Sequence, residues 1–100
     1  MSINSSLSGD GRTVTIAVAG RFDFSTHQQF LRAYKEYEKG DKQFVVDLAR
    51  ADYMDSSAMG MLLQLREHAT KDRVVELRNG SEAIKEILRI ANFDKLFRIE

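Results

Sequence analysis

Cysteine, proline and tryptophan are absent from this chain of 100 residues. Without cysteine, neither a disulfide framework nor thiol chemistry is available, and the absence agrees with a reducing compartment. Charge of one sign is also missing, because 15 lysines and arginines balance 15 aspartates and glutamates. The chain therefore lacks the excess positive charge that is typical of nucleic-acid or acidic-lipid binding, and we expect its partners to be proteins.

Long hydrophobic runs are missing as well. No apolar stretch approaches the roughly 18 residues of a membrane-spanning helix. The first residues do not follow the basic, apolar and small-residue order of a secretory leader. We therefore expect a soluble cytoplasmic protein without direct membrane insertion. Its length predicts one domain over residues 1–100, because two cores of ordinary size would need a longer chain.

The strand patterns come first in the chain. A turn cluster at residues 8–11 separates a short first strand from the alternating apolar pattern of residues 13–18, which predicts a β-hairpin. The apolar run at residues 44–48 predicts a buried strand, and residues 74–77 predict another. Residues 96–99 form either a closing strand or a strap.

Three helices are expected between and after these strands. Apolar residues recur at helical spacing over residues 30–37, and Ser25 with Gln28 resembles a capping box. A second helical pattern follows the buried strand, and a third has Asn79 or Ser81 as its cap. Strands that alternate with helices after a hairpin predict an α/β domain. It would hold a mixed sheet of four to five strands, with three main helices packed against it.

The segment Asp55-Ser56-Ser57-Ala58-Met59-Gly60 lies where the buried strand has ended and the second helix begins. Loops at the carboxyl ends of parallel strands usually carry function. The free N–H groups and the positive dipole end of a helix start tolerate added negative charge. The hydroxyl of Ser56, beside the carboxylate of Asp55, is therefore a candidate for reversible phosphorylation.

A helical wheel at about 100° per residue divides the second helix into faces. Met59 and Leu63 fall on the shoulder next to Ser56. They either widen the buried stripe or offer an apolar surface to a partner, and the exposure of Met59 distinguishes the two. Ser57 either caps the helix or accepts a phosphate in place of Ser56. The apolar face itself is expected to consist of Ala58, Met61, Leu62, Leu65 and Ala69.

Other chemistries find little support in the residues. Asp47 follows an apolar strand as a receiver-domain phosphoacceptor does, but the acidic pair that would hold magnesium is missing. No Gly-x-Ser-x-Gly elbow surrounds Ser56, and His27 and His68 fall on the expected solvent faces of different helices. Two histidines without cysteine do not suggest a zinc site. We therefore expect no enzyme, no metal and no cofactor.

Residues 47–63 resemble the signature of the STAS domain in bacterial anti-sigma-factor antagonists. Residues 20–23 resemble the segment after the second strand of that family. Residues 84–88 and 93–97 resemble its closing helix and tail. The resemblance covers nearly the whole chain and implies a single STAS-like domain over residues 1–100.

This resemblance implies a partner-switching mechanism. In the family, the first serine after the aspartate is phosphorylated by an anti-sigma factor that is also a serine kinase, and that position here is Ser56. The dephosphorylated form binds and sequesters this partner, phosphorylation releases it, and a PP2C-type serine phosphatase resets the cycle. By the same resemblance Asp23 and Asp55 lie on the partner-binding face. The whole predicted surface consists of Asp23, Asp55, Ser57, Ala58, Met59 and Leu63.

An alternative within the same family is a STAS adaptor with a partner unrelated to sigma factors. That partner would be a biofilm or motility regulator, or a membrane transport complex in which the chain is a soluble subunit. The sequence alone gives little basis for choosing between the antagonist and the adaptor. The response of binding to substitutions at Ser56 distinguishes them.

Overall fold

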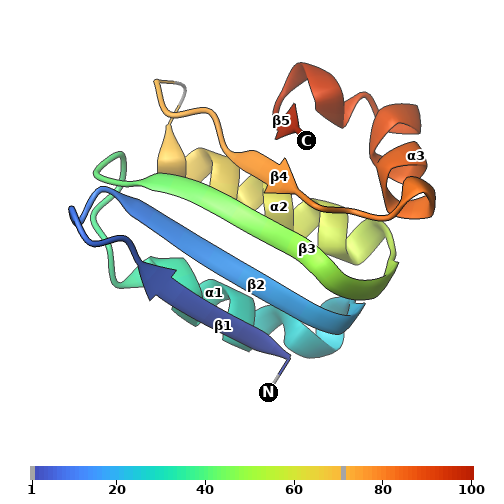
Figure 1. Cartoon of the computed structure of the whole chain (residues 1–100), viewed down its shortest axis with the longest axis horizontal. Coiled ribbons are helices and arrows are strands. Elements are labelled where there is room, and N and C mark those ends of the chain that lie inside the picture. Colours follow the sequence, from blue (N-terminus) through green and yellow to red (C-terminus); the bar gives the residue numbers. More distant parts are fainter. Residues whose placement is uncertain (1, 71) are drawn as a thin grey trace.

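The computed structural model describes residues 2–70 and 72–100. Its five strands form one sheet in chain order (Figure 1). The first two strands are antiparallel, and the later neighbours are parallel, so the expected hairpin and mixed sheet are confirmed. The strands are β1 (Ile3–Leu7), β2 (Thr13–Phe22), β3 (Gln43–Met54), β4 (Glu76–Arg78) and β5 (Arg98–Ile99).

The helices occupy the crossovers between parallel strands, and α1 and α2 lie side by side on one face of the sheet (Figure 1). In the described residues, no helix is both long and apolar enough to cross a membrane. The elements are η1 (Phe24–Thr26) and α1 (His27–Lys35), then α2 (Ser56–Ala69), then α3 (Glu82–Ile90) and η2 (Phe93–Lys95).

The hydrophobic core lies between the sheet and these helices. Alternate residues of β2 are buried, including Val14, Ile16 and Val18, while their neighbours on the helix-free face are half-buried. Rings from different elements meet in this core, as in the pair Phe22 and Phe30 with centroids 5.2 Å apart. Burial of apolar surface contributes about 25 cal/mol per Å² to the stability of the fold. The packed core therefore helps to hold the ends of β2 and β3 in place.

Strand β3 is longer than the sequence pattern predicted. We expected a strand over residues 44–48 and a connection from residue 50 to residue 54, whereas β3 pairs with β2 as far as Met54. The register between the two strands shifts twice, between Ala17 and Ala19 and between Gly20 and Arg21. Such bulges break the two-residue alternation that identifies a strand. The continuation of β3 was therefore hidden in the sequence.

The first helical segment also begins differently. The side chain of Asp23, rather than a box of Ser25 and Gln28, caps the η1 turn that precedes α1. α1 then ends at Lys35 instead of continuing to Tyr37. An aspartate accepts backbone hydrogen bonds at a helix start as well as a serine does. Asp23 and Ser25 were therefore both suitable caps by residue type.

The third helix begins at one of the two caps that the sequence offered. The hydroxyl of Ser81 accepts a hydrogen bond from the backbone N–H of Ile84 at 3.2 Å, which makes Ser81 the N-cap of α3. Asn79 instead adopts a positive φ of 64° and donates its side-chain amide to Asp47 at 3.1 Å.

Candidate functional site at the start of the second helix

The candidate site lies where β2 and β3 end beside each other. Phe22 and Met54 are register partners at these ends, and the residue that follows each of them is an aspartate. Asp23 is the N-cap of η1, and Asp55 is the N-cap of α2. The parallel pairing of the strands therefore brings together two carboxylates that are far apart in the sequence.

Both aspartates form the same kind of cap. Asp55 Oδ1 accepts hydrogen bonds from the backbone N–H groups of Ser57 and Ala58, at 3.1 and 3.2 Å, and from the Ser57 hydroxyl at 2.6 Å. Asp23 Oδ1 accepts from the N–H of Ser25 at 3.0 Å and from its hydroxyl at 2.5 Å. Ser57 is thus a donor to the cap of α2, and the expectation that it caps the helix itself is wrong.

These hydrogen bonds set the charge of the site. The hydroxyl of Ser57, followed by the N–H groups of Ala58 and Ser57, lowers the pKa of Asp55 below its ordinary value of 3.8. Burial and the nearby charge of Asp23 oppose this shift. The pKa of Asp23 is also lowered, first by the hydroxyl of Ser25. Both groups are therefore carboxylates at neutral pH.

Ser56 differs from the two serines that support the caps. It is the first residue of α2, and its side chain is exposed. Among residues 2–70 and 72–100, no hydrogen bond to the Ser56 hydroxyl is formed, whereas the hydroxyls of Ser25 and Ser57 are occupied. The positive end of the α2 dipole lies at this position. An exposed hydroxyl at the positive end of a helix dipole is a geometry in which a serine can accept a phosphate.

Apolar side chains lie near this serine. Phe24 follows Asp23 as Ser56 follows Asp55; it is 69% exposed and stacks on His27 with centroids 5.0 Å apart. Leu63 is 39% exposed, whereas Met59 is half-buried and packs against the core. Met59 therefore widens the buried stripe, and Leu63 offers exposed apolar surface.

The side chain of Ala58 faces away from any partner. It is 0% exposed, because α2 buries the whole expected stripe from Ala58 to Ala69 against the sheet. The expectation that the Ala58 side chain contacts a partner is therefore wrong.

The sequence did not identify two aromatic residues of this site, Phe24 and Tyr53. The Arg21 guanidinium lies 3.8 Å from the centroid of the Tyr53 ring, and its Nε donates to Asp23 Oδ2 at 3.3 Å. Phe24 stands inside an Asp-x-Ser turn and belongs to no apolar stripe, which was the available signal that it points outward. Tyr53 lay in a segment read as a connection.

Two other residues occupy different places from those expected. Asp47 lies within β3, where its Oδ1 accepts from the N–H of Ala49 at 3.0 Å and from Asn79. His68 is half-buried rather than on a solvent face, and its Nε2 lies 2.7 Å from the carbonyl oxygen of Tyr37. In the described part of the chain, no three histidine, aspartate or glutamate side chains are grouped so that they could hold a metal ion.

Comparisons with known proteins agree with this architecture. A family model described as "Mlab, STAS domain" matches residues 5–98. The STAS-domain containing protein PA14_20770 of Pseudomonas aeruginosa (strain UCBPP-PA14) is 46% identical over 100 residues, which cover 99% of each chain.

Solved structures share the fold at lower sequence identity. An anti-sigma factor antagonist from Mycobacterium paratuberculosis superposes with a TM-score of 0.76 and 18% identity, over 98% of this chain and 85% of that chain. The Bacillus cell fate determinant SpoIIAA in its phosphorylated form gives a TM-score of 0.66 and 18% identity, over 98% and 90%. Identities this low show the fold alone.

Proposed function

Because this chain belongs to the STAS domain family, we propose that it is a phosphorylatable antagonist of an anti-sigma factor that acts by partner switching. In this proposal the unphosphorylated protein binds and sequesters, in the cytoplasm, an anti-sigma factor that is also a serine kinase. Phosphorylation of Ser56 releases that partner, and a PP2C-type serine phosphatase restores binding. The proposal rests on the hydroxyl of Ser56, which is exposed, directly follows the capping carboxylate of Asp55, and has no hydrogen-bond partner among the described residues.

The structural relatives support this function at the level of the fold. SpoIIAA is an anti-sigma factor antagonist that exists in an unphosphorylated and a phosphorylated form, and this chain shares its architecture. In the present chain, Ser56 stands directly after the capping residue Asp55 at the end of β3. A kinase can reach a side chain at this position without opening the sheet.

Release of the partner follows from electrostatics. A phosphate adds about −1.5 to −2 charge at neutral pH. On Ser56 it joins the carboxylates of Asp23 and Asp55, whose lowered pKa values keep them ionised. Removing such a group from water costs several kcal/mol unless it is paired, whereas about 1.4 kcal/mol already changes affinity tenfold. Docking on this surface is therefore lost.

The fold tolerates the same charge. Ser56 is the first residue of α2, where backbone N–H groups lack partners within the helix and the dipole is positive. An anion at this position is stabilised rather than repelled by the helix. We infer that phosphorylation acts locally on binding and leaves the core unchanged.

The exposed apolar groups lie on both flanks of α2. Phe24 lies on the α1 side, where it lines a groove of about 260 Å³ together with residues of α2. Leu63 lies toward the other flank, since one turn later Arg66 donates its Nε to the Leu96 carbonyl at 3.3 Å. We propose a partner surface centred on Ser56. It consists of Asp23, Phe24, Asp55, Ser57 and Leu63, without Met59, which packs against the core.

Binding to the kinase-like proteins of the same organism tests this function. Ser56→Asp adds a charge at the start of α2 and is expected to weaken binding at least about tenfold. Ser56→Ala removes only a hydroxyl and is expected to retain wild-type affinity. Ser81→Asp is the matched control, because it adds a charge at the start of α3, at an N-cap position that accepts aspartate.

Three outcomes of this experiment are informative. Loss of binding in Ser56→Asp alone supports partner switching. Tight binding that both Ser56 substitutions leave unchanged would refute it and favour the adaptor, with its biofilm, motility or transport partner. If the same variants are also assayed for hydrolysis, turnover that disappears in Ser56→Ala would contradict the expectation that the chain is not an enzyme.

A further inference from the structure

Arg50 reaches the helix-free face of the sheet through a β-bulge. Ala17 pairs with Asp47 and Ala19 pairs with Arg50, so between these pairs β3 advances by one residue more than β2. Side chains alternate between the two faces of a regular strand, and unbroken alternation from Asp47 would turn Arg50 toward the core. The extra residue turns Arg50 outward and places Ala51, which is 7% exposed, in the core. Bulges commonly redirect a side chain in this way.

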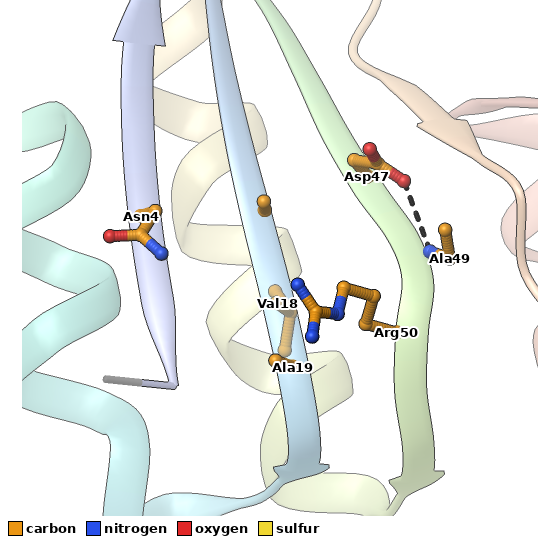
Figure 2. Close-up of a pocket in the computed structure, with 7 residues that line it drawn as sticks. Asn4, Val18, Ala19, Asp47, Ala49 and Arg50 are labelled. Atoms are coloured by element: carbon orange, nitrogen blue, oxygen red, sulfur yellow. Dashed lines mark hydrogen bonds between the residues drawn. The ribbon is translucent and has the colours of Figure 1, made fainter.

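A cavity of about 200 Å³ opens beside this bulge (Figure 2). Three alanine methyl groups give it a small apolar lining, from Ala17 and Ala19 of β2 and Ala49 of β3. Figure 2 shows the Arg50 side chain extending from β3 toward β2, with Asn4 on β1 at the opposite side of the cavity. The polar groups of its rim are Asn4, Asp47 and Arg50.

Two other arginines of this sheet have ion-pair partners of a kind that Arg50 lacks. Arg21 is paired with Asp23 at 3.3 Å, and Arg78 is paired with Glu76 at 2.6 Å. Within residues 2–70 and 72–100, the guanidinium of Arg50 forms neither a hydrogen bond nor an ion pair. A guanidinium has five N–H donors in a planar fork that matches a carboxylate. The donors of Arg50 are thus available to a ligand.

We propose that this cavity binds a small monocarboxylate that also carries a hydrogen-bond donor, which is the chemistry of a free hydroxy acid or amino acid. The Arg50 fork holds the carboxylate, and the side-chain amide of Asn4 assists it. Asp47 lies on the rim, and its charge repels a second negative charge. Its Oδ1 already accepts from Ala49 and Asn79, so Oδ2 is the oxygen that would accept the donor of the ligand. The alanine methyl groups leave room for a short apolar substituent.

The size of the cavity restricts the ligand further. Its volume of about 200 Å³ lies below the roughly 300–1,000 Å³ of sites for drug-sized ligands. The site lies on the sheet face that the helices leave open, and it uses neither Ser56 nor its neighbours. The inference is therefore independent of the proposed partner switch.

Titration of the intact protein with L-alanine, lactate, acetate and succinate, followed by NMR, tests the inference. For L-alanine or lactate we expect saturable shifts of the amides of Ala17, Ala19 and Ala49, with a dissociation constant of about 1 mM or lower. Acetate lacks the donor and succinate has a second charge, so both are expected to bind at least about tenfold more weakly. Sodium chloride is the control for ionic strength.

Two exposed arginines give a matched pair of variants. Arg50→Gln is expected to abolish the saturable shifts, because the carboxylate loses its charged partner. Arg78→Gln, on the same face but paired with Glu76, is expected to leave them unchanged. The inference is overturned if none of the probes gives saturable shifts, if the shifts persist in Arg50→Gln, or if acetate binds as tightly as lactate.

Discussion

Three serines at the candidate site have different surroundings because they stand at different positions relative to a capping aspartate. Ser25 and Ser57 each follow such an aspartate by two residues and donate their hydroxyls to it, at 2.5 and 2.6 Å. Ser56 follows Asp55 directly and keeps its hydroxyl exposed. The position in the cap, rather than the residue type, therefore favours Ser56 over Ser57 as the phosphoacceptor.

The cap of α2 makes stability depend on pH. The pKa of Asp55 is lowered in the folded protein, chiefly by the hydroxyl of Ser57. A carboxyl with a lowered pKa stabilises the fold fully above its ordinary value of 3.8, and this contribution is lost as the pH falls through the folded value. We expect the free energy of unfolding to decrease between about pH 5 and pH 2, and to decrease less steeply in Asp55→Asn.

Urea denaturation of both proteins over this pH range measures the difference. Asp41→Asn is the control, because Asp41 is exposed and caps no helix. Identical pH profiles for wild type and Asp55→Asn would contradict the role given to this cap.

At the scale of the elements, the parallel ends of β2 and β3 create the site. The sequence predicted both helix starts near Asp23 and Asp55, because turn and capping residues follow apolar strands there. It did not predict that β3 continues to Met54, since the bulges interrupt the alternation by which a strand is identified. Pairing with β2 holds this segment in place, and a single sequence does not reveal such tertiary pairing.

Exposure was the least predictable property of the site. The wheel placed Ala58 correctly in the buried stripe of α2, which already argued against a partner contact for its side chain. The half-buried position of Met59 depends on how the neighbouring elements cover α2, and the exposure of Phe24 depends on where η1 begins. Neither the burial of Met59 nor the exposure of Phe24 can be predicted from local sequence patterns.

The η1 turn leaves Phe24 exposed, and Phe24 belongs to the proposed partner surface. Its side chain is 69% exposed, so Phe24→Ser removes little buried surface and is expected to leave the free energy of unfolding within about 0.5 kcal/mol of wild type. If the ring contacts the partner, affinity falls at least about tenfold, as at aromatic interface anchors. Calorimetric titration with the kinase-type partner measures this.

Ile90 provides the comparison for Phe24. It is 74% exposed on α3, away from the start of α2, and Ile90→Ser is expected to leave partner binding unchanged. Equal losses of affinity in the two variants would exclude the η1 turn as a specific contact.

The start of α3 has a structural role, unlike the start of α2. The hydroxyl of Ser81 accepts from the N–H of Ile84 at 3.2 Å. Ser81→Ala removes this cap and is expected to lower the free energy of unfolding by about 1 kcal/mol, without a change in partner affinity. Urea denaturation measures the first effect. A loss of partner affinity would show that α3 also takes part in recognition.

At the scale of the whole molecule, the two faces of the sheet separate two surfaces. The helices and Ser56 belong to one layer, and the cavity beside Arg50 opens on the other face (Figures 1 and 2). The hairpin, the mixed sheet and the three helices were all predicted from the sequence, because each has a clear local pattern. The division into two surfaces required the assembled sheet.

Phosphorylation is expected to leave this architecture intact. Because the helix start accommodates an anion, chemical shifts should change only near residues 23–27 and 54–60, and core residues such as Val46 and Leu77 should keep their shifts. Heteronuclear NMR spectra of the two forms measure this directly. Shift changes throughout the core would instead indicate a global rearrangement and contradict a local block.

The central claim is that the Ser56 hydroxyl becomes a phosphate ester in the cell. Intact-mass measurement and peptide mapping of the protein, isolated from its native cells with phosphatase inhibited, test it most directly. We predict a fraction of molecules heavier by one phosphoryl group, with the modification on Ser56 and none on Ser57. A protein that carries no phosphate under any growth condition, or carries it only elsewhere, would contradict the account.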